Sequence, residues 1–456
     1  MTTSVGVSPG PRTVAPAEPR ARWRSRLDTA TTPARLGLLL ALLVLLSLAW
    51  GALAALTADQ HASAAADVVA VSEPLSLDAE QVYTSLSDAG ATAANAFLAG
   101  GLEPAAARQR YQADITQAAI RIEAASALVG SSAARTQLPG HLSQQGSPAA
   151  QAVGDDLATL SGQLPVYTDE VGTARADNRL GLPLGAAYLR EASALLRGTL
   201  LPAASDIYTR ESALLTSASA QATGLPLILV AIVAGLGFGY VLYRSSRWLT
   251  GHTHRVVNYG LLLAALAGLV SLVWLAGAFT VGRADLLHAQ QQGSAPAQAF
   301  ARAEVAALQA HADESLTLID NSGDDAYQQD YRNQQKLLGP GPGTLLAAVQ
   351  ASAGTSSAAA DAQAWYRAHQ ALRAQDDNGN HAQAVQSALT GAAATDFGRL
   401  SAVLSDGIGA HQAVFAASAR GGRDAFTGLA AGMIVTSLVM VAGCVWGLSR
   451  RLAEYR

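Results

Sequence analysis

Two short stretches gather side chains suited to binding a carboxylate or another protein. The first is ARQRYQAD and the second is TARADNRLGLPLGAAYLREAS. Guanidinium groups bind carboxylates through two parallel hydrogen bonds, and Arg and Tyr are enriched in protein interfaces. We predict contacts with a partner protein here, with helix capping, surface ion pairing or direct binding of an amino acid as the alternatives. The candidate residues are Arg108, Arg110, Tyr111, Arg175, Asp177, Asn178 and Arg179.

A third stretch, YRSSRWLTGHTHRVVNY, lies between two long apolar runs and has no acidic residue. We interpret it as an output surface for a second partner, with Arg244, Arg247, Trp248 and Arg255 as the candidate residues. His252 and His254 form an HxH motif in the same stretch. A zinc site needs three or four protein ligands, and no others lie nearby in sequence, so we expect polar interface residues rather than a metal site.

The motifs of common enzyme classes are missing from the chain. There is no GxxxxGK[ST], no protein-kinase motif set, no HExxH and no CxxC. Lys336 is the only lysine, and Cys444 is the only cysteine, which excludes an intrachain disulfide. We therefore expect no catalytic activity, no cofactor and no nucleic-acid partner.

Four apolar runs are long enough to cross a bilayer, which takes about 20 residues. They cover residues 36–57, 225–243, 256–281 and 426–448. The first run is longer than the apolar core of a secretory signal, so we predict a retained anchor. The interiors of the runs contain no Asp, Glu, Lys, Arg or His, which argues against a transporter.

The charges flanking these runs predict the topology. Segments 1–35, 244–255 and 449–456 hold 12 arginines and only three acidic residues, Glu18, Asp28 and Glu454. Segments 58–224 and 282–425 hold 17 and 14 acidic residues against 9 basic residues each. Because arginine beside a span stays in the cytoplasm, both termini and the short connection 244–255 are predicted inside, in a multi-pass plasma-membrane protein. The two acidic segments are then extracytoplasmic.

The composition predicts an all-α membrane protein with two extracytoplasmic antiparallel helical-bundle domains. Aromatic residues make up only 5% of the chain, while alanine, the best helix former, is abundant. The two outer segments also align as an internal duplication, in which Tyr111 corresponds to Tyr331 and Tyr167 to Tyr366. Residues 1–35 are rich in Pro, Arg, Ser and Thr, and we predict a disordered tail whose arginines contact lipid headgroups.

Two local expectations concern prolines. We expect the helix that continues from the first apolar run to break near Pro74. We expect the last helix of the first bundle to continue into the second apolar run, because residues 212–243 carry no charge. Pro226 would then act as a hinge in that helix.

Two kinds of known protein resemble this chain. A helical outer bundle between two spans resembles the sensing half of bacterial chemoreceptors and sensor kinases. The Arg-rich tail, the four spans and the stretches NRLGLPLGAAYLREAS and AFLAGGLEPAAARQRY resemble the actinobacterial GlnX-type membrane proteins. An actinobacterial origin also fits the preference for arginine over lysine, which is typical of GC-rich genomes.

The second resemblance implies a relay that passes amino-acid availability across the membrane. Its outer partner would be a GlnH-like solute-binding lipoprotein, and its cytoplasmic partner a PknG-like Ser/Thr kinase. We therefore predict a non-enzymatic signal relay. The alternative is a structural or accessory scaffold subunit of a membrane complex.

Overall fold

The computed structural model describes residues 32–101, 103–135, 148–253, 258–320, 326–353 and 357–453. All the elements in these ranges are helices and none is a strand, so the predicted all-α membrane class is confirmed. Most of the predicted disordered tail, together with His254 and Arg255, lies outside these ranges. The helices divide into two compact units.

The first unit consists of Met1–Ala55, Leu229–Trp274 and Ala431–Arg456. It contains the start of α2 (Thr32–Asp67) and most of α8 (Pro226–Thr253), α9 (Tyr259–His288) and α16 (Leu429–Ala453). Among the described residues, four helices are long and apolar enough to span a membrane, in agreement with the four predicted runs. Their exposed leucines and valines are those expected of surfaces that face lipid.

Small residues allow close packing inside this first unit. A Cβ atom on Gly260 would lie 2.4 Å from the backbone of Gly447, so α9 and α16 cross where only glycine fits. The indole Nε1 of Trp50 donates to Ser271 Oγ at 3.1 Å, and Ser437 Oγ donates to the carbonyl of Ser47 at 3.0 Å. These bonds satisfy polar groups in a region where lipid offers no hydrogen-bond partner.

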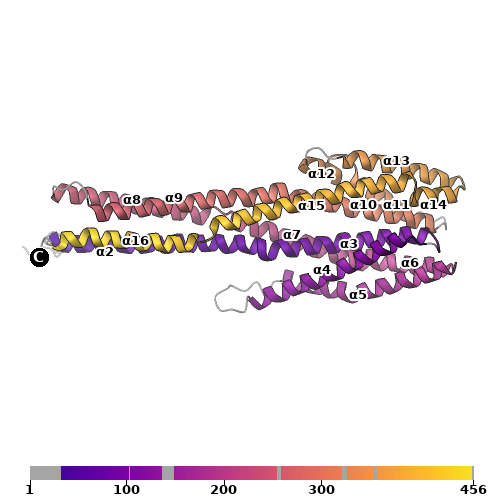
Figure 1. Ribbon diagram of the computed structural model, residues 1–456, viewed down its shortest axis with the longest axis horizontal. Helices are drawn as coiled ribbons and strands as arrows, with labels where there is room; N and C mark the ends of the chain where they lie inside the picture. The colour runs from indigo at the N-terminus through magenta and orange to yellow at the C-terminus, as the bar shows by residue number, and fades with distance from the viewer. Residues whose placement is uncertain are drawn as a thin grey trace, which may run out of the picture. The chain divides into compact units, whose positions relative to one another are not determined.

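The second unit, Leu56–Ile228 and Leu275–Ala430, contains both predicted bundles. Its first half is built from α3 (Glu73–Leu98), α4 (Ala105–Arg135), α5 (Pro148–Arg179), α6 (Leu184–Leu195), the π-helical turn η3 (Leu196–Leu200) and α7 (Leu201–Ala222). Leu86, Leu160, Leu200 and Tyr167 form the centre of its core. Figure 1 shows α4, α5 and α6 on one flank of α3.

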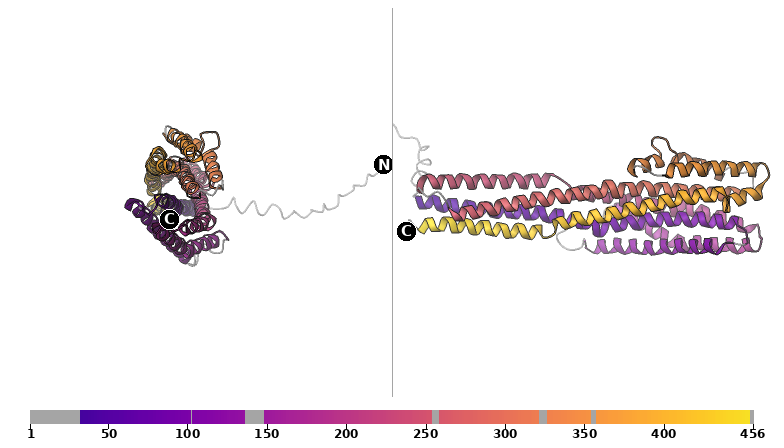
Figure 2. Two further views of the ribbon diagram at one scale, coloured as in Figure 1. Left: turned by 90° about the vertical axis from the view of Figure 1, so that its right-hand side faces the viewer. Right: turned by 45° about the horizontal axis from the view of Figure 1, so that its top comes forward.

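The second half repeats this arrangement with α10 (Ala295–Asp320), α11 (Ala326–Leu338), α12 (Leu345–Ala353), α13 (Ala358–Asp377), α14 (His381–Leu389) and α15 (Ala392–Phe426). Trp365, Tyr331 and Leu400 are buried at its centre. In both views of Figure 2, the orange helices of this half lie on one side of the unit and the purple helices of the first half on the other.

The two halves join through α3 and α10, which occupy equivalent places in the repeat. Val69 packs on the small apolar cluster that contains Ala289, and Leu98 packs with Leu318 in another, and the residues of each pair are 220 positions apart. Because equivalent residues meet at both ends, α3 and α10 run in the same direction about a local pseudo-two-fold axis. Alanines at the contact, such as Ala91 and Ala307, let the two backbones approach closely.

The expected break near Pro74 does not occur. The π-helical turn η2 (Val68–Ser72) joins α2 directly to α3, and η4 (Ala289–Ser294) joins α9 to α10 in the same way. Pro74, Pro202 and Pro296 each stand two residues after a π-helical turn. The wider turn accommodates the proline, which would otherwise clash with the carbonyl four residues earlier.

The expected continuous helix from 212 to 243 is also wrong. Helix α7 ends at Ala222, and α8 begins at Pro226 after the non-helical residues Gly224 and Leu225. A residue before proline avoids the α conformation, and proline is favoured at the first helical position, so Pro226 starts a helix rather than bending one. The second half has a matching break, where Gly428 adopts φ +75° between α15 and α16.

Candidate functional site

Several predicted contact residues pair with one another inside the first half. Tyr111 on α4 is buried, and the guanidinium of Arg175 on α5 lies 4.0 Å from the centre of its ring. Arg175 Nε is 3.2 Å from Glu103 Oε1, and the other oxygen of Glu103 is 3.4 Å from Arg108 Nε. Tyr111 and Arg175 therefore help to join α4 to α5, while Arg108 remains half-exposed.

The remaining predicted residues lie at the ends of helices and along the join between the halves. Asn178 Nδ2 donates to the carbonyl of Phe97 at 2.8 Å, which satisfies an end carbonyl of α3. Arg110 is exposed on α4, and its Nε is 2.9 Å from Asp88 on α3. The carbonyl of Asp177 accepts from the amide of Leu182 at 2.9 Å, and Arg179 is exposed at the end of α5.

The corner between α5 and α6 carries an apolar surface that the sequence reasoning missed. Leu180, Leu182 and Leu184 are 73%, 46% and 55% exposed, directly after Arg179. Gly181 in this turn has φ +69°, a conformation that favours glycine. The sequence RLGLPLG did contain a signal for this exposed surface, because leucine alternates there with glycine and proline. Glycine and proline form a tight turn, and the large leucine side chains in such a turn cannot be buried. These three leucines and Arg179 are called the corner surface below.

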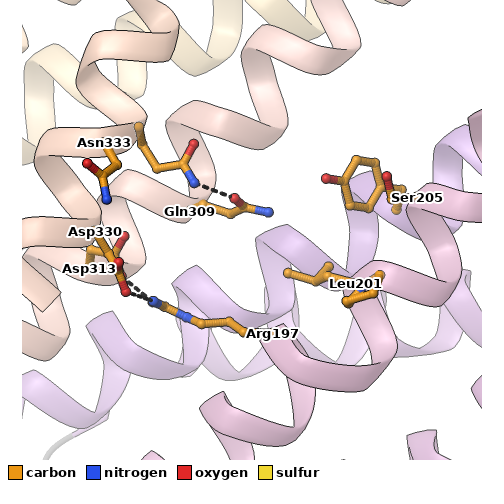
Figure 3. Close-up of a pocket in the computed structure, with 10 residues that line it drawn as sticks. Arg197, Leu201, Ser205, Gln309, Asp313, Asp330 and Asn333 are labelled. Atoms are coloured by element: carbon orange, nitrogen blue, oxygen red, sulfur yellow. Dashed lines mark hydrogen bonds and ion pairs between the residues drawn. The ribbon is translucent and has the colours of Figure 1, made fainter. Parts of the chain in front are cut away.

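On one side of the α3–α10 join, a cavity of about 390 Å³ lies between the halves. Figure 3 shows Arg197 of η3 reaching across to Asp313 on α10 and Asp330 on α11. Gln309 on α10 and Gln334 on α11 hydrogen-bond at 2.8 Å on the same wall as the two aspartates. Burial raises the pKa of Asp313 to about 7 even though Arg197 lowers it, so this ion pair is strongly desolvated.

On the other side of the join lies a groove of about 590 Å³. Its polar wall comes from α3, α4 and α10, and its opposite wall comes from the end of α14 and from α15. Burial and the neighbouring charge of Asp88 raise the pKa of Glu304 to about 7, although Arg110 lowers it. The residues of the polar wall that matter below are Asp88, Asn95, Arg110, Glu304 and His311.

The cavity and the groove occupy related places in the two halves. Arg110 on α4 corresponds to Asp330 on α11, 220 positions later, and each lines one of the two spaces. Their chemistry differs, because Asp330 helps to bind Arg197 across the join whereas Arg110 binds Asp88. The repeat therefore supplies two similar hollows with different side chains.

A buried ionic cluster lies beside the groove in the second half. Glu314 Oε2 is 2.7 Å from His369 Nδ1, and its Oε1 is 3.5 Å from His311 Nδ1. Burial alone would raise the pKa of Glu314, but the two histidines lower it to about 2. The ring of His369 stacks on Tyr331 with 3.6 Å between centres. Within the described residues, no three His, Cys, Asp or Glu side chains are arranged to hold a metal ion.

The residues of the predicted output surface lie on a helix rather than a loop. Helix α8 continues to Thr253, so Arg244, Arg247 and Trp248 stand on its final turns. Arg244 and Arg247 are exposed, and Arg247 NH1 is 3.3 Å from the hydroxyl of Tyr243. A helical turn presents these side chains in fixed directions, as an interface needs. Arg255 lies outside the described residues.

Comparison with known proteins gives one family. Residues 64–220 match the model of the actinobacterial sensor domain, a segment that runs from the end of α2 to the end of α7. No curated protein and no solved structure matches the chain significantly. The match covers the first half of the second unit, including the corner surface, and supports an actinobacterial sensor protein with a role in sensing.

Proposed function

We propose that this chain is a non-enzymatic transmembrane signal relay that reports solute availability, in particular that of amino acids, to the cytoplasm. The observation that carries the proposal is the match of residues 64–220 to a sensor-domain family. The four apolar helices supply the membrane part. An outer solute-binding lipoprotein and a cytoplasmic Ser/Thr kinase, the partners implied by the resemblance to GlnX-type proteins, would be its input and its output.

The corner surface is the proposed contact for the lipoprotein. Three exposed leucines in one turn form an apolar patch of the kind that binds another protein. Arg179 next to it, and Arg108 on the neighbouring helix, add positive charge that would pair with carboxylates of the partner. Tyr111, Arg175 and Asn178 would support this surface from behind through their contacts within the first half.

Continuous helices supply the proposed transmission. α2, η2 and α3 form one helical rod, and α9, η4 and α10 form a second. A π-helical turn holds an extra residue, and moving the turn along the helix rotates the residues that it passes by about 100°. A change at the α3–α10 join would thereby rotate a span, and the movement would reach the kinase through Arg244, Arg247, Trp248 and Arg255.

The proposal is tested in cells that contain both partners. Leu180→Asp should reduce recovery of the lipoprotein in pull-downs at least several-fold, because a charge in the centre of an apolar contact is costly. Leu337→Asp is the matched control, since Leu337 on α11 is a leucine that is 50% exposed elsewhere in the same unit. Equal recovery from the two variants would reject the corner surface.

The output is tested by the double variant Arg244→Ala and Arg247→Ala. It should keep lipoprotein binding while phosphorylation of the kinase substrate no longer follows the external amino acid. Reporter fusions in the same variant check that the topology is unchanged, because these arginines also contribute to the positive-inside signal. If the wild-type chain itself gives phosphorylation that ignores the external solute, the relay is rejected in favour of a scaffold.

A further inference from the structure

The groove beside the α3–α10 join contains a carboxylate whose charge is not balanced. Glu304 lines the groove, and among the described residues no cation forms an ion pair with it. Arg110 is the nearest cation that acts on it, but Arg110 is engaged with Asp88 at 2.9 Å. Burial and Asp88 raise the pKa of Asp114 to about 8, and the charge of Arg110 is taken up by its ion pair with Asp88.

The far end of the groove offers hydrogen-bond donors. His311 is only 7% exposed, and its Nε2 has a long contact of 3.5 Å with Nδ2 of Asn95, nitrogen to nitrogen. Its Nδ1 faces Glu314 Oε1 at 3.5 Å, and this interaction helps to lower the pKa of Glu314. The ring is fixed in place by stacking on Phe397, with 3.9 Å between centres. Asn95 Nδ2, held by this long contact, can therefore turn to a ligand acceptor that lies beside the fixed ring of His311.

The two ends of the groove are separated by two turns of helix. Glu304 and His311 are seven positions apart on α10, and Asp88 and Asn95 are seven positions apart on α3. Seven residues of α-helix span about 10 Å. The volume of the groove, about 590 Å³, lies within the range of small-molecule sites.

We propose that this groove binds an elongated organic cation, with a primary ammonium group against Glu304 and an oxygen acceptor at Asn95 and His311. Basic amino acids such as lysine and ornithine have this form, with a terminal ammonium several carbon atoms from a carboxylate. An acidic amino acid would place negative charge beside Glu304 and Asp88 and is excluded. The proposal goes beyond the relay, because it concerns a ligand of this chain itself and needs neither partner.

Binding of such a cation should depend on pH. Glu304 faces Asp88 and Glu80 on α3 and Arg110 on α4, and burial together with the charge of Asp88 raises its pKa to about 7. The cation pairs with the ionised carboxylate, so the affinity should rise about tenfold from pH 6 to pH 8 and a proton should be released on binding below pH 7. Calorimetry in two buffers of different ionisation enthalpy measures that proton.

The test uses the purified full chain in detergent, with L-lysine as the probe. Nε-acetyl-L-lysine has nearly the same length without the charge, and L-glutamate has the opposite charge. The variant Glu304→Gln removes the carboxylate but keeps its shape. Glu123→Gln is the matched control, because Glu123 is an exposed carboxylate on α4 that does not line the groove.

We expect saturable binding of L-lysine by the wild-type chain and by Glu123→Gln, at least tenfold weaker binding by Glu304→Gln, and at least tenfold weaker binding of Nε-acetyl-L-lysine. Asn95→Ala should lose affinity for L-lysine more than for cadaverine, which has no carboxylate. Absence of saturable binding of L-lysine, L-ornithine and cadaverine would overturn the proposal. Equal affinity in Glu304→Gln and the wild type would also overturn it.

Discussion

At the scale of single residues, two glutamates ten positions apart on α10 have opposite environments. Glu304 is desolvated and forms no ion pair with any cation in the described ranges, while Glu314 lies between His311 and His369. The pKa of Glu304 is raised to about 7 and that of Glu314 is lowered to about 2. The same substitution, Glu to Gln, should therefore change the stability of the protein in opposite directions.

Glu304→Gln should raise the thermal unfolding midpoint of the full chain at pH 8. A raised pKa means that the ionised carboxylate destabilises the folded state, increasingly so as the pH rises from about 4.5 through 7. The substitution removes this destabilisation, which amounts to about 1–3 kcal/mol of unfolding free energy at pH 8. At pH 4.5 the variant and the wild type should unfold together. Unfolding scans between pH 4.5 and pH 8 measure this.

Glu314→Gln should lower the unfolding free energy at pH 7 by about 3 kcal/mol, because it removes a buried carboxylate whose ionised form is stabilised by His311 and His369. A lowered pKa means that the stabilisation is complete above about 4.5 and is lost as the pH falls towards 2. The difference from wild type should therefore shrink below pH 4.5. A shift of the same sign for both variants at pH 8 would contradict the two assigned environments.

Sequence reasoning selected residues of the right chemical types but could not assign their surroundings. Arg175 and Tyr111 were chosen as contact residues, and they pack on each other across α4 and α5. They are 64 positions apart in the chain, so only the fold brings them together. Glu304 and Glu314 gave no signal, because both stand on the same Ala-rich helix and differ in what faces them across the fold. Leu180, Leu182 and Leu184 were passed over, because leucine normally predicts burial.

At the scale of elements, the repeat places a π-helical turn at equivalent positions in the two rods. In η4 the proline has a visible consequence, because Pro296 has no N–H to donate to the carbonyl of Gln292. His411 Nδ1 on α15 lies 2.7 Å from that oxygen and donates to it instead. Sequence reasoning could not find these turns, since a proline after an apolar helix predicts a break equally well.

Removing the extra residue of η2 should separate folding from signalling. We expect deletion of Val69, combined with Pro74→Ala so that no proline clashes in the resulting α-helix, to leave the flanking faces in register. The protein should insert and bind the lipoprotein, while kinase output should no longer follow the external solute. Substrate phosphorylation with and without the amino acid is the measurement.

Two controls accompany this variant. Pro74→Ala alone keeps the length of the turn and should signal normally. Deletion of Ala64, which lies in α2 outside the π-helical turn, rotates the helix on one side by about 100° and should lower the unfolding midpoint. Normal signalling by the Val69 deletion would show that the turn is not part of the transmission.

At the scale of the whole molecule, the distribution of arginine predicts the orientation in the membrane. Reporter fusions at Gly251 should be active in the cytoplasm, and fusions at Gly146 and Gly341 should be active outside, because 12 arginines and only three acidic residues flank the spans on the predicted inner side. An outside-active reporter at Gly251 would reverse the positions of the corner surface and the output surface.

The four spans and the repeat could be read from the sequence because charge, hydropathy and spacing are properties of segments. The joining of the two halves into one unit could not be predicted from the sequence. The alanine-rich face of α3 that packs on α10 has the same pattern as a face packed inside its own half. Only the pairing of particular residues, such as Leu98 with Leu318, distinguishes the two cases.

The join between α3 and α10 also bears on the origin of the chain. A single half with its two spans would leave the joining face of its α3-like helix uncovered, and a second copy of itself, related by the same axis, would cover that face. This geometry is the one expected if the ancestor was a homodimer whose two subunits were joined by gene fusion through the connection between α8 and α9. Identical subunits must carry identical hollows. Fusion removed that constraint, so that one hollow could acquire the Arg197–Asp313 bridge while the other kept an open groove with Glu304.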